Sequence, residues 1–310
     1  MLLKIYYLIH RLYKSYPVNS IYYRIKVREV FGWIMTRLVV SALMPGHRKC
    51  FGEIQEDYLI SLTSFGKRVY ETHKTILSLK NQHQATAKII LWLGEEEWNV
   101  GNLPTTLAVL LDERFEIRYV ENLGSHKKYF FAMREFQNTH IIICDDDYIY
   151  PPLFVSLLMA SHKQLPYAVH CHSARRIKCT SSGDFLPYGK WVFSKPDTQR
   201  FQHKLLPLGG GGVLFPKSMF SAADLTQLRD LIDEFKTTDD LLLLALLLVK
   251  GEKVQQLDYI NKLFIPSYPQ NKYLYLAKTN VPYQNDVNWA KLNEKFNLAQ
   301  YFLQERVVGI

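Results

Sequence analysis

Three adjacent aspartates, Asp145–Asp147, follow directly after the apolar run 141–144 and precede two tyrosines and a proline. A short apolar run of this kind predicts a buried strand. Carboxylates that face one another at the end of a strand repel each other unless they share a cation, and no basic residue adjoins them in the sequence. Mg²⁺ and Mn²⁺ prefer oxygen ligands and often bind phosphate oxygens as well. One acid would be enough to cap a following helix, so three predict a metal–phosphate site.

A second acidic pair, Asp239 and Asp240, precedes the apolar run 241–249. The run is too short to span a bilayer and predicts a buried helix that ends at Gly251. A preceding threonine or Asp239 can cap this helix, which would leave the other acid free. A carboxylate at a helix N-terminus is expected to stay ionised at neutral pH, as a general base must.

Two further segments have residue types that suit ligand contacts. The glycine run in 208–215 allows a backbone to approach a ligand closely, although it lacks the spacing of a dinucleotide fingerprint or a Walker A loop. His170 and His172 would lie on one face of a strand. Because the pattern offers no third ligand for zinc, we expect hydrogen-bonded polar residues or acceptor contacts there. Arg175, Arg176 and Lys178 follow these histidines.

The segments between residue 57 and the aspartates alternate between strand and helix patterns. This alternation is typical of a mostly parallel sheet with helices on both faces. Ligands bind such sheets beyond the carboxyl ends of the strands, where the three aspartates are expected. Strands are predicted at 58–63, 88–93, 115–121 and 140–144, and helices at 72–82, 103–113 and 127–136.

The positive charge is concentrated in an N-terminal arm, residues 1–50. It has nine Lys or Arg and one acid, a net charge of +8 out of +9 for the chain. Basic residues interspersed with aromatic ones predict helices that lie on an anionic membrane surface. The alternative is that these helices only pack on the remaining domain, 51–310. Nucleic acid is not an expected partner.

The arm does not have the pattern of a signal peptide, because basic residues interrupt its apolar stretch. Its best apolar run, 30–44, contains Arg37 and is shorter than the roughly 20 residues of a membrane span. The four cysteines form no CxxC pair, and Cys144 and Cys171 lie in apolar runs. Buried free thiols suit a reducing cytoplasm. We therefore expect a cytoplasmic protein on the inner face of the membrane.

Five segments together resemble bacterial glycosyltransferases of the GT-A fold, which build surface polysaccharide, capsule or lipopolysaccharide. The resemblance covers roughly residues 57–290 and leaves the arm unexplained. It implies a GT-A-like α/β fold, a nucleotide-sugar donor (foremost a UDP-sugar) and a saccharide or lipid-linked acceptor. The segments are "ISLTSFGKR" (60–68), "SLKNQ" (78–82), "IILWL" (89–93), "KKYFFAM" (127–133) and "IICDDDYIYP" (142–151).

The resemblance also implies a role for individual residues. Asp145 and Asp147 match the family's DxD motif and would hold Mn²⁺ or Mg²⁺. Asp240, with Asp239 as the alternative, matches the general base of inverting members. The histidine that many members supply as a metal ligand after the base is absent, and Asn285 or Asp286 could replace it. Residues implied to contact the nucleotide sugar are Thr63, Arg68, Lys128, Asp145, Asp146, Gly210 and Gly211.

Two other functions remain open at this point. A sugar-phosphate nucleotidyltransferase would share the sheet and the metal, but it normally has a loop rich in glycine and basic residues after the first strand. The segment "TSFGKR" has one glycine. An inactive membrane-associated scaffold would be expected to lose the acids, and both acidic motifs are intact.

Overall fold

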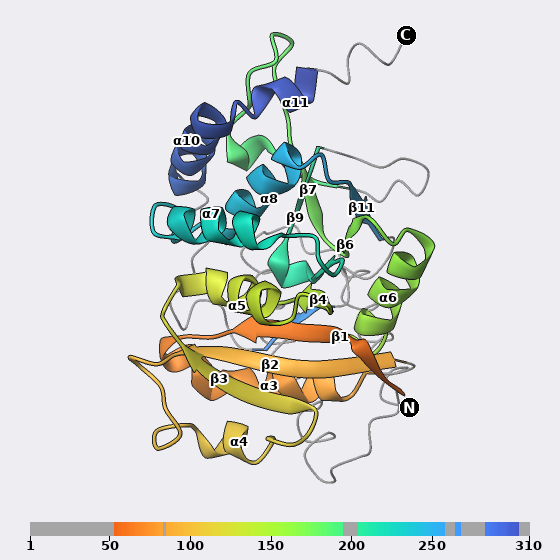
Figure 1. Ribbon diagram of the computed structural model, residues 1–310, viewed down its shortest axis with the longest axis vertical. Helices are drawn as coiled ribbons and strands as arrows, with labels where there is room; N and C mark the ends of the chain where they lie inside the picture. The colour runs from red at the N-terminus through yellow and green to blue at the C-terminus, as the bar shows by residue number, and fades with distance from the viewer. Residues whose placement is uncertain (1–52, 83–84, 195–203, 258–263, 268–282, 304–310) are drawn as a thin grey trace, which may run out of the picture.

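A computed structural model describes residues 53–82, 85–194, 204–257, 264–267 and 283–303 (Figure 1). The basic arm lies outside these residues, so the predictions made for it are not addressed by the structure. No helix among the described residues is long and apolar enough to cross a membrane.

A seven-stranded sheet forms the centre of the molecule, in the order β11-β6-β10-β4-β1-β2-β3. Neighbouring strands pair in parallel except at β10, which is antiparallel to both β4 and β6. The strands are β1 (Glu53–Thr63), β2 (Ala85–Gly94), β3 (Phe115–Val120), β4 (His140–Ile143), β6 (Val169–Cys171), β10 (Val213–Phe215) and β11 (Val254–Gln256).

Helices cover both faces of this sheet, because alternate strand residues point to opposite sides. Leu59 packs in a core cluster with residues of α5, α7 and α8, whereas Ile60 packs in a second cluster with residues of α3, α4 and α6. The predicted mostly parallel α/β sheet flanked by helices is therefore confirmed, and it is consistent with a GT-A-like fold. The helices are α3 (Val69–Lys80), α4 (Thr105–Ala108), α5 (Lys127–Glu135), α6 (Phe154–Gln164), α7 (Ala222–Ile232), α8 (Asp239–Val249), α10 (Asn285–Phe296) and α11 (Ala299–Leu303).

Helix α8 is apolar on all sides and is buried. Every residue from 241 to 248 lies in the core, as a helix without a polar face must. Gly251 adopts a positive φ of 69° just after the helix, a conformation that glycine tolerates at a helix C-terminus. The prediction of a buried core helix ending at this glycine is confirmed.

The helix predicted over 103–113 is wrong in its length, because only the single turn α4 forms. Leu107 and Leu110 are buried, whereas Val109 and Leu111 are exposed, so the apolar residues do not share one helical face. The chain then turns at Asp112, whose carboxylate accepts hydrogen bonds from the backbone N–H groups of residues 114 and 115. This turn leads the chain into β3.

Two small sheets flank the carboxyl edge of the main sheet. One pairs β5 (Tyr148–Ile149) with β12 (Ile265–Pro266), and the other has the order β8-β7-β9. Strand β9 leads directly into the glycine turn at 209–212. The strands of the second sheet are β7 (Ala174–Arg176), β8 (Val192–Phe193) and β9 (Leu205–Pro207).

Candidate active site

Three segments that are far apart in the sequence meet at the carboxyl edge of the sheet. They are the loop 63–68 after β1, the aspartates 145–147 after β4 and the glycine turn 209–212 before β10. Strands β1 and β4 are parallel neighbours, so they end at the same edge. Strand β10 is antiparallel, so it begins there, with Val213 opposite Ile143. The sheet topology thus brings together the polar residues that follow or precede these strand ends.

Asp145 is the most open member of the aspartate motif, with 35% of its side chain exposed. Its Oδ1 lies 2.8 Å from Lys128 Nζ, and a Cβ atom on Gly210 would lie 2.9 Å from its Oδ2. The hydroxyl of Tyr150 accepts a hydrogen bond from the Asp145 backbone N–H and donates one to the Gly210 carbonyl. Tyr150, which was not among the predicted site residues, therefore holds the glycine turn against the motif.

Asp146, which the resemblance implies to contact the nucleotide sugar, is buried. Only 3% of the residue is exposed. Its carboxylate accepts hydrogen bonds from Ser64 and from the Arg68 guanidinium, and its backbone carbonyl accepts one from Thr75. This aspartate anchors the motif to the β1–α3 loop.

Arg68 likewise lies at the motif rather than on the surface. Its guanidinium pairs with Asp146 and lies 3.2 Å from Asp147 Oδ2. Lys128 pairs with Asp145. The three carboxylates have no basic residue beside them in the sequence, but the tertiary structure brings two cations to them.

Asp147 is the carboxylate with the least compensation. Its Oδ1 is buried and forms no hydrogen bond within the described part of the chain. Burial raises the pKa of Asp147 to about 7, with Asp145 and Asp146 adding to the rise and Arg68 opposing it. A buried carboxylate oxygen without a donor is suited to bind a cation.

A divalent ion is compatible with these residues, provided that a ligand adds oxygens. The described residues contain no group of three His, Cys, Asp or Glu side chains that could hold a metal by themselves. Mg²⁺ is commonly bound through one or two carboxylates together with substrate phosphates. Asp145 and Asp147 could supply the two carboxylates.

The second acidic pair lies beside the first motif. Lys128 Nζ is 2.8 Å from Asp239 Oδ2, the same distance as from Asp145 Oδ1. The Gly209 backbone N–H donates to Asp240 Oδ1 at 3.1 Å. One lysine and one glycine turn therefore connect two acidic motifs that are separated by more than ninety residues of sequence.

The two acids of this pair have opposite pKa shifts. Burial, together with the negative charge of Asp239, raises the pKa of Asp240 to about 8. Burial also acts to raise the pKa of Asp239, but Lys128 and His126 outweigh it and hold that pKa below its ordinary value. The expectation that the helix N-terminus keeps Asp240 ionised at pH 7 is therefore wrong for the ligand-free protein, because burial and the neighbouring charge outweigh the helix end.

Neither acid caps helix α8. Thr238 is the N-cap residue, without a side-chain cap hydrogen bond. Its hydroxyl instead donates to the Phe235 carbonyl and accepts from Asn288 of α10. Both aspartates stand in the first turn, and both are available to the site.

The glycine turn requires residues without a Cβ atom because neighbouring side chains pack directly against its backbone. A Cβ atom on Gly209 would lie 2.8 Å from Lys128 Nζ, and one on Gly211 would overlap Ser173. Gly212 has a φ of 81°, and a Cβ there would overlap the Phe154 ring. The predicted positions Gly210 and Gly211 are thus part of a tightly packed turn.

The remaining predicted residues have structural partners. Thr63 Oγ1 donates to the Trp92 carbonyl of β2 at 2.7 Å. His170 and His172 are fully buried and bond to the backbone carbonyls of residues 165 and 154, so they are hydrogen-bonded core residues. Asn285 and Asp286 begin α10, and Asp286 accepts from a backbone N–H of residue 188.

Lys127, the neighbour of the predicted contact Lys128, is a second buried lysine. Only 1% of it is exposed, and its Nζ donates to Asn122 Oδ1 at 2.7 Å. Burial lowers the pKa of Lys127 to about 8, although Glu96 and Glu97 oppose this shift. The two adjacent lysines are visible in the sequence, but the sequence does not show that Lys127 contacts Asn122 whereas Lys128 contacts the two acidic motifs.

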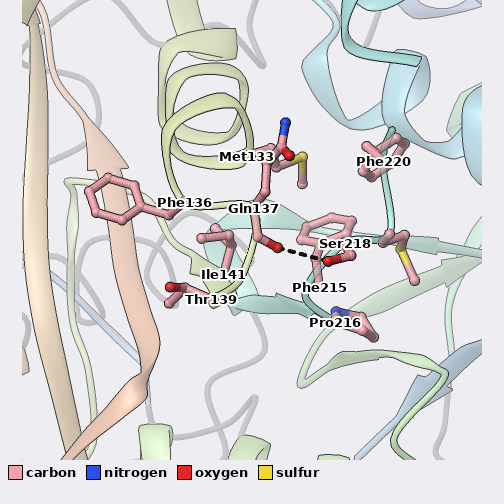
Figure 2. A pocket seen from close by; sticks show the side chains of 10 residues that line it. Met133, Phe136, Gln137, Thr139, Ile141, Phe215, Pro216, Ser218 and Phe220 are labelled. Carbon is pink, nitrogen blue, oxygen red and sulfur yellow. Dashed lines mark hydrogen bonds between the residues drawn. The ribbon is translucent and has the colours of Figure 1, made fainter. Parts of the chain in front are cut away.

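A pocket at the opposite edge of the sheet lacks the charged residues of the candidate active site (Figure 2). It lies where β4 begins and β10 ends, and Ser218 donates to the Gln137 carbonyl across it. Its lining contains no ionisable side chain. The lining residues are Met133, Phe136, Gln137, Thr139, Ile141, Phe215, Pro216, Ser218, Met219 and Phe220.

No protein-family model matches the chain, and no curated protein matches it in sequence. Three solved structures are similar to parts of it, at 8–11% identity and TM-scores of 0.37–0.40. At these values the similarity carries no inference about the function of this chain.

The first of these structures is a CMP:2-keto-3-deoxy-manno-octonic acid synthetase complexed with CTP (11% identity, TM-score 0.37; 65% of this chain and 88% of that chain). The second is the mannosyltransferase PcManGT from Pyrobaculum calidifontis in complex with GDP-Man and Mn²⁺ (8%, 0.39; 76% and 65%). The third is the inositol-1-phosphate CTP transferase from T. maritima (11%, 0.40; 79% and 98%).

Proposed function

We propose that this protein is a metal-dependent glycosyltransferase that moves a sugar from a nucleotide-sugar donor to a hydroxyl of a saccharide or lipid-linked acceptor. The supporting observation is the convergence of two acidic motifs on one lysine, with Lys128 2.8 Å from both Asp145 and Asp239. The donor diphosphate needs acids that hold a metal ion, and the acceptor hydroxyl needs an acid that takes its proton. The two motifs would provide both kinds of acid side by side. The assignment to surface-polysaccharide assembly rests on the sequence resemblance.

On the donor side, Asp145 and Asp147 would hold Mn²⁺ or Mg²⁺. When bound, the ion would offset the negative charge that develops on the departing nucleoside diphosphate. The open Asp145 and the unbonded Asp147 Oδ1 suit this role. Asp146 and Arg68 would keep the motif in place. Gly210 and Gly211 would let the backbone approach the donor sugar.

On the acceptor side, Asp240 would be the general base. A base works best with a pKa near the operating pH, and that of Asp240 is raised to about 8. Its Oδ1 accepts from Gly209, which leaves Oδ2 to take the proton from the acceptor hydroxyl. The hydroxyl oxygen bonds to the anomeric carbon as the bond to the diphosphate breaks on the opposite face, so the configuration inverts.

Two product assays distinguish this function from a nucleotidyltransferase. A glycosyltransferase releases a nucleoside diphosphate from a UDP- or GDP-sugar, or CMP from a CMP-sugar, whereas a nucleotidyltransferase releases pyrophosphate from a nucleoside triphosphate and a sugar phosphate. Pyrophosphate release without any transfer from nucleotide sugars would overturn the proposal. A melting-temperature screen with UDP-, GDP- and CMP-sugars would choose the donor, since a ligand that binds the folded state raises that temperature.

Metal dependence is tested in the same screen. The increase in melting temperature caused by the nucleotide should appear with Mn²⁺ and disappear with EDTA. Asp147→Asn should remove it, whereas Asp233→Asn, a substitution at an exposed carboxylate of an ion pair on α7, should retain it. Equal nucleotide affinity in EDTA would contradict the metal site.

The N-terminal arm would attach the enzyme to an anionic membrane surface. Its net charge of +8 in fifty residues supports this, because each basic residue near such a surface contributes about 1 kcal/mol. Deleting residues 1–45 should release the protein from anionic vesicles in a sedimentation assay. Unchanged co-sedimentation of the truncated protein would show that the arm only packs on the domain.

A further inference from the structure

Lys128 is held in a fixed slot between the two acidic motifs. It stands in the first turn of α5, and its backbone carbonyl accepts a hydrogen bond from Ser61 of β1. Only 6% of its side chain is exposed. A Cβ atom on Gly209 would lie 2.8 Å from the ammonium nitrogen, so the glycine turn packs directly against this group.

One ammonium group therefore serves several carboxylates. Asp145 and Asp239 each lie 2.8 Å from it, and Asp240 is also nearby, since a Cβ atom on Gly209 would lie 2.8 Å from Lys128 Nζ and 3.2 Å from Asp240 Oδ1. A single positive charge cannot fully neutralise both Asp145 and Asp239. How much of it Asp239 and Asp240 receive depends on what else neutralises Asp145.

We propose that Lys128 is a positioning residue that acts as an exchangeable counter-ion and couples the donor-side Asp145 to the acceptor-side pair Asp239–Asp240. The inference rests on the proposed function, since it needs a cation to bind at Asp145. With a metal ion held at Asp145, Lys128 would no longer be needed to neutralise that carboxylate and would pair with Asp239. Lys128 thus competes with the metal for Asp145, and donor binding changes the charge around the proposed base.

The first test is binding of Mn²⁺ to the metal-free full-length protein, measured by calorimetry without nucleotide and with UDP, GDP or CMP, whose phosphates could supply further oxygen ligands. Lys128→Gln removes the competing cation, so Mn²⁺ should bind about tenfold more tightly than to the wild type, the size of effect that a neighbouring opposite charge has on a carboxylate. Lys88→Gln is the matched control. It removes a lysine that forms a surface ion pair with Glu116, and it should leave Mn²⁺ affinity unchanged.

A double-mutant cycle separates coupling through Lys128 from direct charge effects. Asp239→Asn leaves Lys128 to Asp145 alone, so it should weaken Mn²⁺ binding. In the Lys128→Gln background most of that weakening should disappear, because no shared cation remains. An equal effect of Asp239→Asn in both backgrounds would mean that the two sites are independent, and the inference would be overturned.

The cycle remains informative if Lys128→Gln does not fold. The double variant Lys128→Gln/Asp239→Asn removes a cation and a carboxylate together, which leaves no new unpaired charge at that contact. It should bind Mn²⁺ at least about tenfold more tightly than Asp239→Asn, in which Lys128 is fully committed to Asp145. Equal affinities of these two variants would overturn the inference.

Failure of the inference and failure of the proposed function give different results. A wild-type protein that binds Mn²⁺ neither alone nor with UDP, GDP or CMP would overturn the metal site and the inference with it. A wild-type protein that binds Mn²⁺, with affinity unaffected by Lys128→Gln, would overturn the inference alone.

Discussion

The two acidic motifs use the same residue type and divide their charge in the same way. In each, a cation pairs with the neighbour of the acid proposed to act: Arg68 pairs with Asp146 in the first motif, where Lys128 also pairs with Asp145, and Lys128 pairs with Asp239 in the second. In each, the adjacent aspartate has a pKa raised toward neutrality, to about 7 for Asp147 and about 8 for Asp240. Adjacent buried carboxylates with too few cations cannot all ionise, so each motif retains one acid that can hold a proton.

The difference lies in what supports the remaining acid. Asp240 accepts a hydrogen bond from a backbone N–H, whereas Asp147 has a buried oxygen without a donor. A backbone donor orients Asp240 and leaves one oxygen for a proton, while an unbonded oxygen is suited to a cation. Hydrogen-bond partners, rather than residue type, would therefore determine which aspartate acts as a base and which binds a metal ion.

The largest effect should come from removing the proposed base. Asp240→Asn keeps the shape of the side chain but cannot take a proton, so transfer should fall by about 10²–10⁴-fold while metal-dependent nucleotide binding stays near that of the wild type. Asp147→Asn should reduce both. Turnover and nucleotide affinity measured on both variants would check this, with Asp233→Asn as the control. Full activity of Asp240→Asn would move the base to Asp239 or end the inverting mechanism.

Removing the cation of the first motif should be costly for stability. Arg68→Met leaves Asp146 buried without its partner, a change that costs about 3–5 kcal/mol. Arg229→Met, which breaks a more exposed ion pair with Glu121, should cost at most about 1 kcal/mol. Urea denaturation of both variants would measure the difference. Similar costs would mean that Asp146 readily finds other partners, contrary to an anchoring role.

The raised pKa of Asp240 should make stability depend on pH. Its pKa is about 8 in the folded protein and 3.8 as the reference value, so its stabilising contribution is complete below pH 3.8 and is lost as pH rises toward 8. The slope is at most about 1.4 kcal/mol per pH unit. The difference in unfolding free energy between wild-type and Asp240→Asn proteins, measured without metal, should therefore change steadily between pH 5 and 8. A constant difference would contradict the raised pKa.

The smallest effect should come from a neutral donor to the first motif. Ser64 donates to Asp146 and accepts from Thr72, and Ser64→Ala should cost about 1–3 kcal/mol, as for a buried hydrogen bond to a charged group. Ser182→Ala, in an exposed loop, should stay within about 0.5 kcal/mol. Thermal unfolding would rank the two. A Ser64 variant as stable as the Ser182 variant would leave Arg68 as the main anchor of Asp146.

The sequence by itself determined the strand and helix pattern near the site. The apolar run before Asp145 became β4, and the all-apolar run after Asp240 became a core helix, because burial of such segments depends mainly on their own composition. The apolar residues of 103–113 predicted a longer helix than α4. Which of them are buried was decided by the fold, and they do not share one helical face. The two acidic motifs were recognisable because each follows or precedes a segment that must be buried.

Only the tertiary structure decided how the acids are paired. Arg68 and Lys128 lie 78 and 17 residues from the aspartates that they contact, and sheet order rather than sequence spacing brings them there. The pKa order within Asp239 and Asp240 depends on which of the two meets Lys128, and Lys127 differs from Lys128 only through the loops around it. Electrostatic interactions between buried groups depend on distance and desolvation in the folded chain, and a sequence records neither.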